Sequence, residues 1–261
     1  MRIKVVLQTP PDGVFIPYDY QYYLTAAIYR KLSLADPEYA AFLHQQGYGE
    51  RGYKLFTFSQ LRARSKKGAS QGFWIVGEAW LVVSSPLTRF FFPLLQGLLN
   101  EPFLSLGDVH LPVKKVLTQQ APPLAGGAKF VCLSPVVVTT GTGEGPARYL
   151  RYHEDPALFS EKIRQNLLRR YRACYGSSPE DERLFFYFDH RYLSEKKGTK
   201  LIQYRDHSIF GYLAPVQLEG SPELIRFAWE AGIGEKNSMG FGCLEYVGEN
   251  SPWQLFFVDL Q

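Results

Sequence analysis

The sequence contains few cysteines and few histidines, and neither residue type is spaced for metal binding. The three cysteines, Cys132, Cys174 and Cys243, lie far apart and form no CxxC pair, which argues against a disulfide framework and a structural zinc site. The five histidines never occur at ligand spacing, and the HExxH, Walker A and EF-hand patterns do not occur. We therefore expect neither a metal nor another cofactor.

Long apolar segments are also missing. Residues 1–10 (MRIKVVLQTP) carry too short an apolar run for a signal peptide, and no stretch reaches the ~20 apolar residues of a membrane span. We therefore expect a cytoplasmic protein without a membrane partner. The chain has 261 residues, 46% of them hydrophobic, which is enough for one large domain or two small ones. Its formal net charge of +4 allows a polyanionic partner.

Hydrophobic periodicity predicts the order β, α, β, β, α, β over residues 1–118. Leu24 and Ile28 belong to an apolar stripe with helical spacing, and Asp36 is a suitable N-cap for the next helix. A basic stretch, residues 62–67, is expected as the loop of a hairpin. The predicted elements are a strand at 2–8, a helix at 20–35, a short helix from 37, strands at 53–61 and 73–83, a helix from 86 to about 100, and a strand at 109–117.

A linker is predicted at residues 119–127 (QQAPPLAGG), where proline and glycine replace periodicity. It separates a first domain, residues 1–118, from a second domain, residues 128–261. The second domain is predicted to contain strands at 129–134 and 136–140, a helix at 156–175, strands at 184–188 and 200–214, a helix at 221–231, and strands at 243–247 and 253–258. The pattern favours an α+β protein with two tandem ferredoxin-like domains, a fold that does not by itself define an activity.

Residues 232–242 (GIGEKNSMGFG) carry four glycines, one lysine and one asparagine directly after a predicted amphipathic helix. Because glycine permits positive φ and close backbone approach, this loop could place N–H groups and Lys236 against phosphates. A helix C-cap followed by a tight entry into a strand would explain Gly232 and Gly234 as well. The residues alone leave both interpretations open.

With this loop, three further stretches give the chain its resemblance to a known family: QYYLTAAIY (21–29), FLHQQGY (42–48) and YKLFTFS (53–59). The chain resembles Cas6, the CRISPR-associated endoribonuclease of the RAMP (repeat-associated mysterious protein) superfamily, over essentially its whole length. The resemblance implies two tandem ferredoxin-like domains. It also implies cleavage of CRISPR repeat RNA in precursor transcripts, which releases guide crRNAs.

The resemblance also implies catalytic residues. In the archaeal-type members that this chain most resembles, metal-independent cleavage is attributed to a tyrosine in the first helix, a histidine near the end of the next helix and a lysine entering the following strand. The matching positions are Tyr29, His44 and Lys54. Helical spacing places Tyr29 and His44 off the apolar stripes, although a partly buried aromatic and a polar helix end are the structural alternatives.

These three residue types suit attack by the 2′-hydroxyl of the RNA, which leaves a 2′,3′-cyclic phosphate and a 5′-hydroxyl. Histidine exchanges protons near neutral pH, lysine stabilises developing negative charge, and tyrosine can orient or share the proton of the nucleophile. The sequence does not decide whether Tyr29 or His44 acts as the base.

Candidate RNA-binding residues are cations and glycines of the second domain. Lys162, Arg169 and Arg172 lie off the apolar stripe of the long helix, for which a solvated helix face is the alternative. Arg148 and Arg151 are each followed by a tyrosine, a combination suited to phosphate contact and base stacking, for which an edge strand or a loop is the alternative. Lys196, Lys197 and Lys200 around Gly198 resemble a hairpin tip. The candidates in the glycine-rich loop are Gly232, Gly234, Lys236, Asn237, Gly240 and Gly242.

The sequence thus predicts a metal-independent endoribonuclease whose partner is CRISPR repeat RNA. Other Cas proteins of an effector complex and a second copy of the chain are further candidate partners. A non-catalytic RAMP subunit that binds crRNA in an effector complex is the alternative, against which Tyr29, His44 and Lys54 together argue. An RNA-binding module unrelated to CRISPR has only the predicted topology in its favour.

Overall fold

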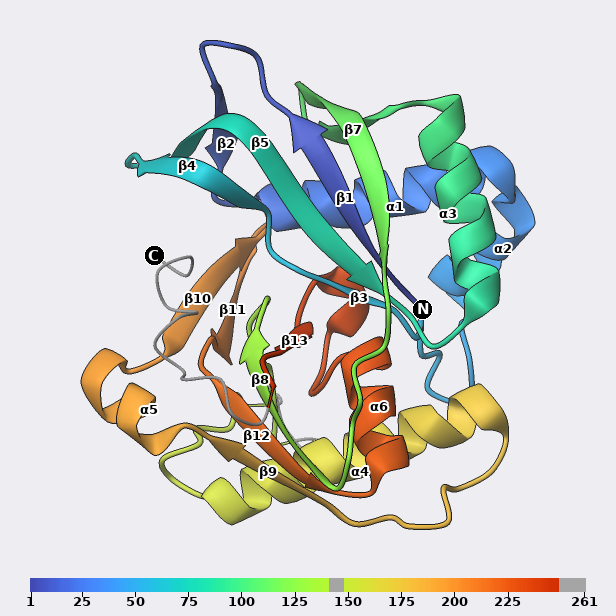
Figure 1. Ribbon diagram of the computed structural model, residues 1–261, viewed down its shortest axis with the longest axis vertical. Coiled ribbons are helices and arrows are strands. Elements are labelled where there is room, and N and C mark those ends of the chain that lie inside the picture. The colour runs from blue at the N-terminus through green and yellow to red at the C-terminus, as the bar shows by residue number, and fades with distance from the viewer. Residues whose placement is uncertain (141–147, 249–261) are drawn as a thin grey trace.

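The computed structural model describes residues 1–140 and 148–248, which form two antiparallel sheets, each covered on one face by helices, and a separate two-stranded hairpin (Figure 1). The first sheet and its helices lie at the top of Figure 1 and the second set lies below. Each set follows the ferredoxin-like order, so the predicted fold class of two tandem ferredoxin-like domains is confirmed. No helix in the described part of the chain is long and apolar enough to cross a membrane.

The first half is built on a sheet in which β1 lies between β5 and β7, antiparallel to both. Ile3, Val5 and Leu7 of β1 face the apolar stripe of α1, and α3 packs beside α1 on the same face. The elements are β1 (Arg2–Gln8), β2 (Val14–Pro17), α1 (Tyr20–Ala35), α2 (Pro37–Gln45), β3 (Thr57–Phe58), β4 (Arg62–Gly68), β5 (Gly72–Ser84), α3 (Thr88–Asn100), β6 (Phe103–Leu106) and β7 (Val109–Gln119).

The hairpin prediction in the first half was partly wrong. The basic stretch expected as a loop is strand β4, which pairs with β5 from Arg62 to Gly68. The strand expected at 53–61 is reduced to the two residues of β3. Most of β4 is exposed to solvent, so its sequence shows none of the alternation that burial imposes, and charged side chains are common on such edge strands.

The second half is a four-stranded sheet in the order β13-β8-β12-β9, covered by α4 and α6. Asp155 caps α4, its carboxylate accepting a bond of 2.8 Å from the backbone N–H of Leu158, and the predicted bounds of α4 and β9 are confirmed. The elements are β8 (Gly127–Cys132), α4 (Pro156–Tyr175), β9 (Leu184–Phe188), α5 (His190–Lys196), β10 (Thr199–Tyr204), β11 (His207–Tyr212), β12 (Val216–Gly220), α6 (Pro222–Ala231), the 3-10 turn η1 (Asn237–Met239) and β13 (Leu244–Tyr246).

Three predictions in the second half need correction, and the first is the strand expected at 200–214, which is divided into β10 and β11. Residues 136–140 form only isolated bridges through Val136 and Thr139, not a strand. The lysines around Gly198 do not form a hairpin tip, because Lys196 ends the unpredicted helix α5 and the β10–β11 hairpin turns after Tyr204. No residue of α5 is buried, so the sequence carries no apolar stripe there. The strand expected at 253–258 lies outside the described residues.

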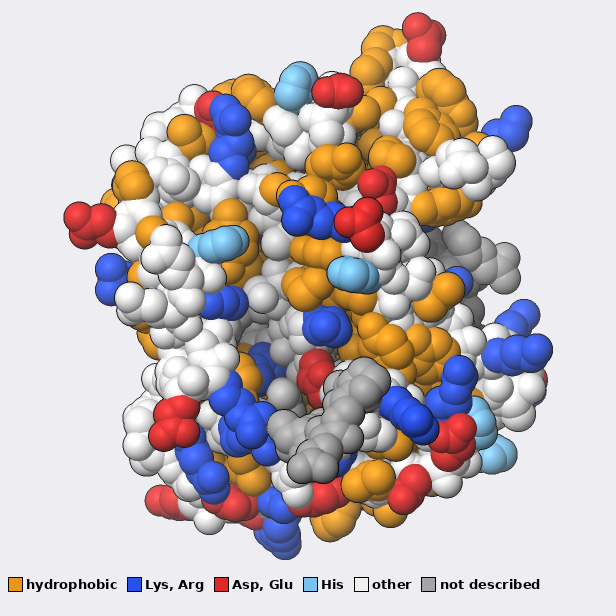
Figure 2. Space-filling view, turned by 180° about the vertical axis from the view of Figure 1, so that it is seen from behind, with side chains coloured by type: hydrophobic (Ala, Val, Ile, Leu, Met, Phe, Trp, Pro, Cys, Tyr) orange, Lys and Arg blue, Asp and Glu red, His pale blue; other side chains and the backbone are white. Residues whose placement is uncertain are grey.

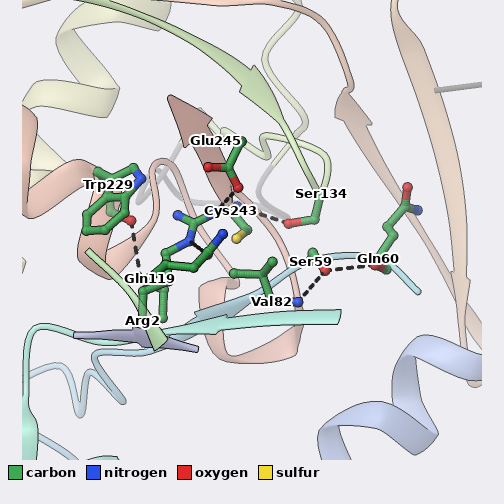
Figure 3. A network of polar contacts seen from close by, with 10 residues as sticks. Arg2, Ser59, Gln60, Val82, Gln119, Ser134, Trp229, Cys243 and Glu245 are labelled. Carbon is green, nitrogen blue, oxygen red and sulfur yellow. Dashed lines mark hydrogen bonds and ion pairs between the residues drawn. The ribbon is translucent and has the colours of Figure 1, made fainter. Parts of the chain in front are cut away.

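The two halves meet around a buried arginine (Figure 3). The Arg2 side chain donates to Gln119 Oε1 at 2.8 Å and to Glu245 Oε2 at 3.0 Å, and its guanidinium carbon lies 4.9 Å from the ring centroid of Trp229. β1 is thereby attached to α6 and β13. The linker at 119–127, between the end of β7 and the start of β8, stays a prediction as a domain boundary.

Candidate active site and RNA-binding cleft

Two helices of the first half bring Tyr29 and His44 together. Tyr29 lies in the third turn of α1, and His44 lies near the end of α2, which starts after its N-cap Asp36. The two rings meet edge to face, with 5.5 Å between centroids and 83° between planes. Tyr29 is half-buried, with Phe56 on another side, whereas His44 is exposed. The imidazole can therefore meet a ligand in solvent.

Lys54 joins this pair from the loop between α2 and β3. Its Nζ donates to the backbone carbonyl of His44 at 3.2 Å. The next residue, Leu55, has a φ of +54°, which is uncommon for a bulky side chain, and its carbonyl accepts a bond of 2.7 Å from Ser85 Oγ. Burial of Leu55 and this hydrogen bond hold the loop in that conformation, and the loop holds Lys54 beside His44.

Burial shifts the acid–base properties of two of the three residues. It raises the pKa of Tyr29, with a further contribution from Tyr204, and it lowers the pKa of Lys54. Near neutral pH the Tyr29 hydroxyl is therefore protonated and can donate a hydrogen bond. The three side chains together offer a proton donor, an exposed imidazole and a cation.

A cleft of about 580 Å³ lies between the two halves beside Lys54. Its walls are the loop before β3, helix α4 and the glycine-rich loop. Figure 2 shows Lys and Arg side chains gathered on the face of the molecule over α4. The cationic side chains that line the cleft, apart from the buried Arg170, are Arg51, Lys54, Lys162, Arg169 and Lys236.

Among the residues that the structure describes, three buried polar atoms in the walls of this cleft have no hydrogen-bond partner: Tyr53 Oη, Asn166 Oδ1 and Arg169 Nε. An unpaired buried polar atom costs about 1–3 kcal/mol. Because these atoms are closed off from solvent, a ligand in the cleft could reach them only if the side chains around them moved.

The glycine-rich loop is tightly packed, and its glycines serve that packing. The Asn237 amide nitrogen donates to the carbonyls of Ile233 at 2.9 Å and Phe241 at 3.0 Å. A Cβ at Gly240 would lie 2.4 Å from the Phe58 ring, and one at Gly242 would lie 1.9 Å from the Ile233 carbonyl oxygen. Both glycines also have positive φ.

Much of the loop backbone is engaged within the fold. The N–H groups of Ile233, Glu235, Met239, Gly240 and Gly242 donate to backbone carbonyls. Gly232 and Gly234 are buried like the other two glycines. The loop therefore presents the exposed side chain of Lys236 to the cleft more readily than a row of backbone amides.

Arg170 supports this loop and was not predicted from the sequence. Its guanidinium is buried and donates to the carbonyls of Gly232, at 2.9 Å, and Ala231. Burial lowers the pKa of Arg170 to about 10. Arg170 directly follows Arg169 in the sequence. The position of each residue relative to the apolar stripe of α4 is the sequence feature that distinguishes the buried Arg170 from Arg169, which lines the cleft.

The remaining cations predicted to bind RNA do not line the cleft in the described part of the chain. Arg172 binds Glu182 at 2.7 Å and Ser178 at 2.7 Å. The Arg151 guanidinium lies 4.7 Å from the ring centroid of Phe210, and Arg148 is exposed beside Thr140. Their contacts with RNA stay predictions. In the same described part, no group of three His, Cys, Asp or Glu side chains is arranged to hold a metal ion.

Comparison with models of known protein families identifies the family of the chain. Residues 15–117 match the model of the CRISPR-associated protein Cas6 N-terminal region, and residues 119–246 match that of the Cas6 C-terminal region. The chain belongs to the Cas6 family. Predicted membership of this family of CRISPR-associated endoribonucleases is thereby confirmed.

Relatives and solved structures support the assignment over nearly the whole chain. The CRISPR-associated endoribonuclease Cas6 1 of Methanocaldococcus jannaschii is 32% identical, with 96% of this chain and 94% of the relative aligned. The CRISPR-associated endoribonuclease Cas6 of Pyrococcus furiosus is 26% identical, covering 95% and 90%. A structure described as a Cas6-related gene product of P. furiosus superposes with a TM-score of 0.81 at 26% identity, covering 96% of this chain and 99% of its own.

Proposed function

We propose that this protein is a metal-independent endoribonuclease that cuts CRISPR repeat RNA in precursor transcripts and releases guide crRNAs. The observation that carries the proposal is the convergence of Tyr29, His44 and Lys54 beside the cationic cleft. The names of the M. jannaschii and P. furiosus relatives support the substrate class. Binding of other Cas proteins, self-association and a cytoplasmic location stay predictions.

In the proposed reaction, the 2′-oxygen of the nucleotide before the cut attacks the adjacent phosphorus. The bond from phosphorus to the 5′-oxygen of the next nucleotide breaks, which gives a 2′,3′-cyclic phosphate and a 5′-hydroxyl. One proton leaves the 2′-hydroxyl and one is added to the 5′-oxygen, so the step requires neither water nor a metal ion as a reactant. General acid–base catalysis of this kind contributes about 10²–10⁴-fold.

The surroundings of Tyr29, His44 and Lys54 support a separate catalytic role for each. Tyr29 is kept protonated by burial, so it suits donation of a hydrogen bond or proton to an oxygen of the reacting phosphate. His44 is exposed and is the group of the three best suited to accept the proton of the 2′-hydroxyl. Lys54 supplies positive charge as the phosphorane forms.

The cleft would hold the RNA strand beside these groups. Its five cationic side chains suit contacts with successive phosphates. Arg51 and Lys54 come from the first half, and Lys162, Arg169 and Lys236 come from the second. A strand in the cleft would therefore contact both halves.

Repeat RNA with one 2′-deoxy nucleotide immediately 5′ of the cut tests the proposal. We expect this RNA to bind with unchanged affinity and to resist cleavage, whereas a deoxy nucleotide one position further upstream is cut normally. Unmodified RNA should yield a cyclic phosphate and a 5′-hydroxyl, identified by mass spectrometry. Efficient cleavage of the first deoxy substrate would mean that water attacks, and the proposed mechanism would be wrong.

A further inference from the structure

Helix α1, which carries Tyr29, is bound on one side by the second half of the chain. Gln21 Nε2 donates to the carbonyls of Met239, at 3.1 Å, and Gly240 in the glycine-rich loop. One turn later, Tyr204 at the end of β10 donates from its hydroxyl to Thr25 Oγ1 at 3.1 Å. Figure 1 shows the β10–β11 hairpin rising from the second half to reach α1.

A second contact secures the hairpin tip on the helix. The Arg205 guanidinium lies 4.1 Å from the ring centroid of Tyr22 and also bonds its hydroxyl. The rings of Tyr22 and Tyr204 meet edge to face at 5.7 Å. Tyr204 is half-buried in this contact, so its hydroxyl is held toward the helix.

Helical geometry links these contacts to the site. Gln21, Thr25 and Tyr29 follow one another at intervals of four residues, so they share one face of α1. Thr25 Oγ1 also donates to the Gln21 carbonyl at 3.1 Å, which connects the Tyr204 hydroxyl to the helix backbone. Tyr29 lies one turn beyond Thr25 and is close enough to Tyr204 to be influenced by it electrostatically.

We infer that Tyr204 is a positioning residue for the cleavage reaction: through Thr25 it fixes the rotation of α1 and thereby directs the Tyr29 side chain toward His44. The inference rests on the proposed function, in which Tyr29 takes part in cleavage. Because the Tyr204 hydroxyl is engaged with Thr25, it acts on the geometry of Tyr29 rather than on the RNA. The second half would thus influence catalysis by the first half in two ways, by binding RNA and by positioning Tyr29 through the tip of the β10–β11 hairpin.

Two substitutions in the full-length chain break the contact from either side. Tyr204→Phe removes the donor and Thr25→Val removes the acceptor, while Thr25→Ser retains a hydroxyl and should restore the rate. We expect each of the first two to lower the single-turnover cleavage rate by about 5- to 20-fold, since small displacements of reacting groups are costly, with RNA affinity changed less than about twofold. Their combination should be no slower than either alone.

Tyr187→Phe is the matched control, because it removes an exposed hydroxyl from β9, away from α1. In a Tyr29→Phe background, Tyr204→Phe should cause no further loss. The inference would be overturned if Tyr204→Phe cleaved RNA as fast as the Tyr187→Phe control. It would also be overturned if Tyr204→Phe lowered the rate of Tyr29→Phe by the same factor as it lowers the wild-type rate.

A spectroscopic measurement decides the inference without cleavage. In protein labelled with [13Cζ]tyrosine, the Tyr29 signal, assigned by its loss in Tyr29→Phe, should shift in Tyr204→Phe and in Thr25→Val but not in Tyr187→Phe. A Tyr29 signal unmoved by both substitutions would overturn the inference. If the wild-type protein does not cut repeat RNA, the proposed function fails, and this signal alone shows whether Tyr204 positions Tyr29.

Discussion

The five cationic side chains of the cleft predict how strongly salt weakens RNA binding. On single-stranded RNA, each neutralised phosphate contributes about 0.7 to the slope of log K against log salt. If all five contact phosphates, the slope is about −3.5, and affinity falls about 130-fold between 50 and 200 mM salt. Lys162→Gln or Lys236→Gln removes one contact, so the slope should be about −2.8 and the fall about 50-fold.

Fluorescence anisotropy with labelled repeat RNA measures these slopes, the 2′-deoxy substitution at the cut preventing cleavage during the titration. Arg226→Gln is the control, because Arg226 is exposed on α6 outside the cleft and its loss changes the net charge by the same amount. The slope of this control should equal that of the wild type. If both lysine variants retain the wild-type slope, or if Arg226→Gln lowers it as much, the cleft is not the RNA-binding surface.

Three further predictions concern catalysis and folding. His44→Ala should slow single-turnover cleavage by ~10²-fold or more with RNA affinity nearly unchanged, because a proton-transfer group is lost; equal losses of binding and cleavage would make His44 an RNA contact instead. Cleavage should continue undiminished in excess EDTA, and activity lost there and restored by Mg²⁺ would contradict the metal-independent mechanism. Gly240→Val should lower the midpoint of urea unfolding or prevent folding, because its Cβ would collide with Phe58 at a φ of +83°. Gly68→Ala, where a Cβ meets no atom within 4 Å, should unfold at the wild-type midpoint, and equal midpoints for both variants would show that the loop tolerates side chains.

Helices with one buried face could be predicted from the sequence, whereas two elements that are mostly exposed could not. The stripe through Phe159, Ile163 and Leu167 is buried in the core as predicted, and the predicted bounds of α4 are those of the structure. β4 and α5 lack such a stripe because water surrounds most of their side chains, and both escaped prediction.

The candidate site, too, could be predicted only in part. Resemblance to the family indicated Tyr29, His44 and Lys54, but their proximity depends on a loop with Leu55 at positive φ, which no sequence pattern signals. The contact between Thr25 and Tyr204 joins positions 179 residues apart, and periodicity carries no information about such pairs. Periodicity indicates which face of a helix or strand is buried, but it does not indicate which distant element packs against that face.

The division of the site between two halves explains why the loop at 232–242 is rich in glycine. Lys54 lies in the loop before β3 in the first half, and Thr57 Oγ1 of β3 donates to the Phe241 carbonyl of the glycine-rich loop at 2.9 Å. Gly240 packs against Phe58 in the same strand, so the loop approaches β3 as closely as a backbone can. This approach keeps Lys236, which faces the cleft from the loop, at a defined position relative to Lys54. Because a displacement of about 1 Å can cost ~10²-fold in rate, a phosphate held by the second half is useful to the first only if the halves are docked tightly. The glycines permit that docking, and in the proposed function Lys236 is the residue of this loop that would contact the RNA.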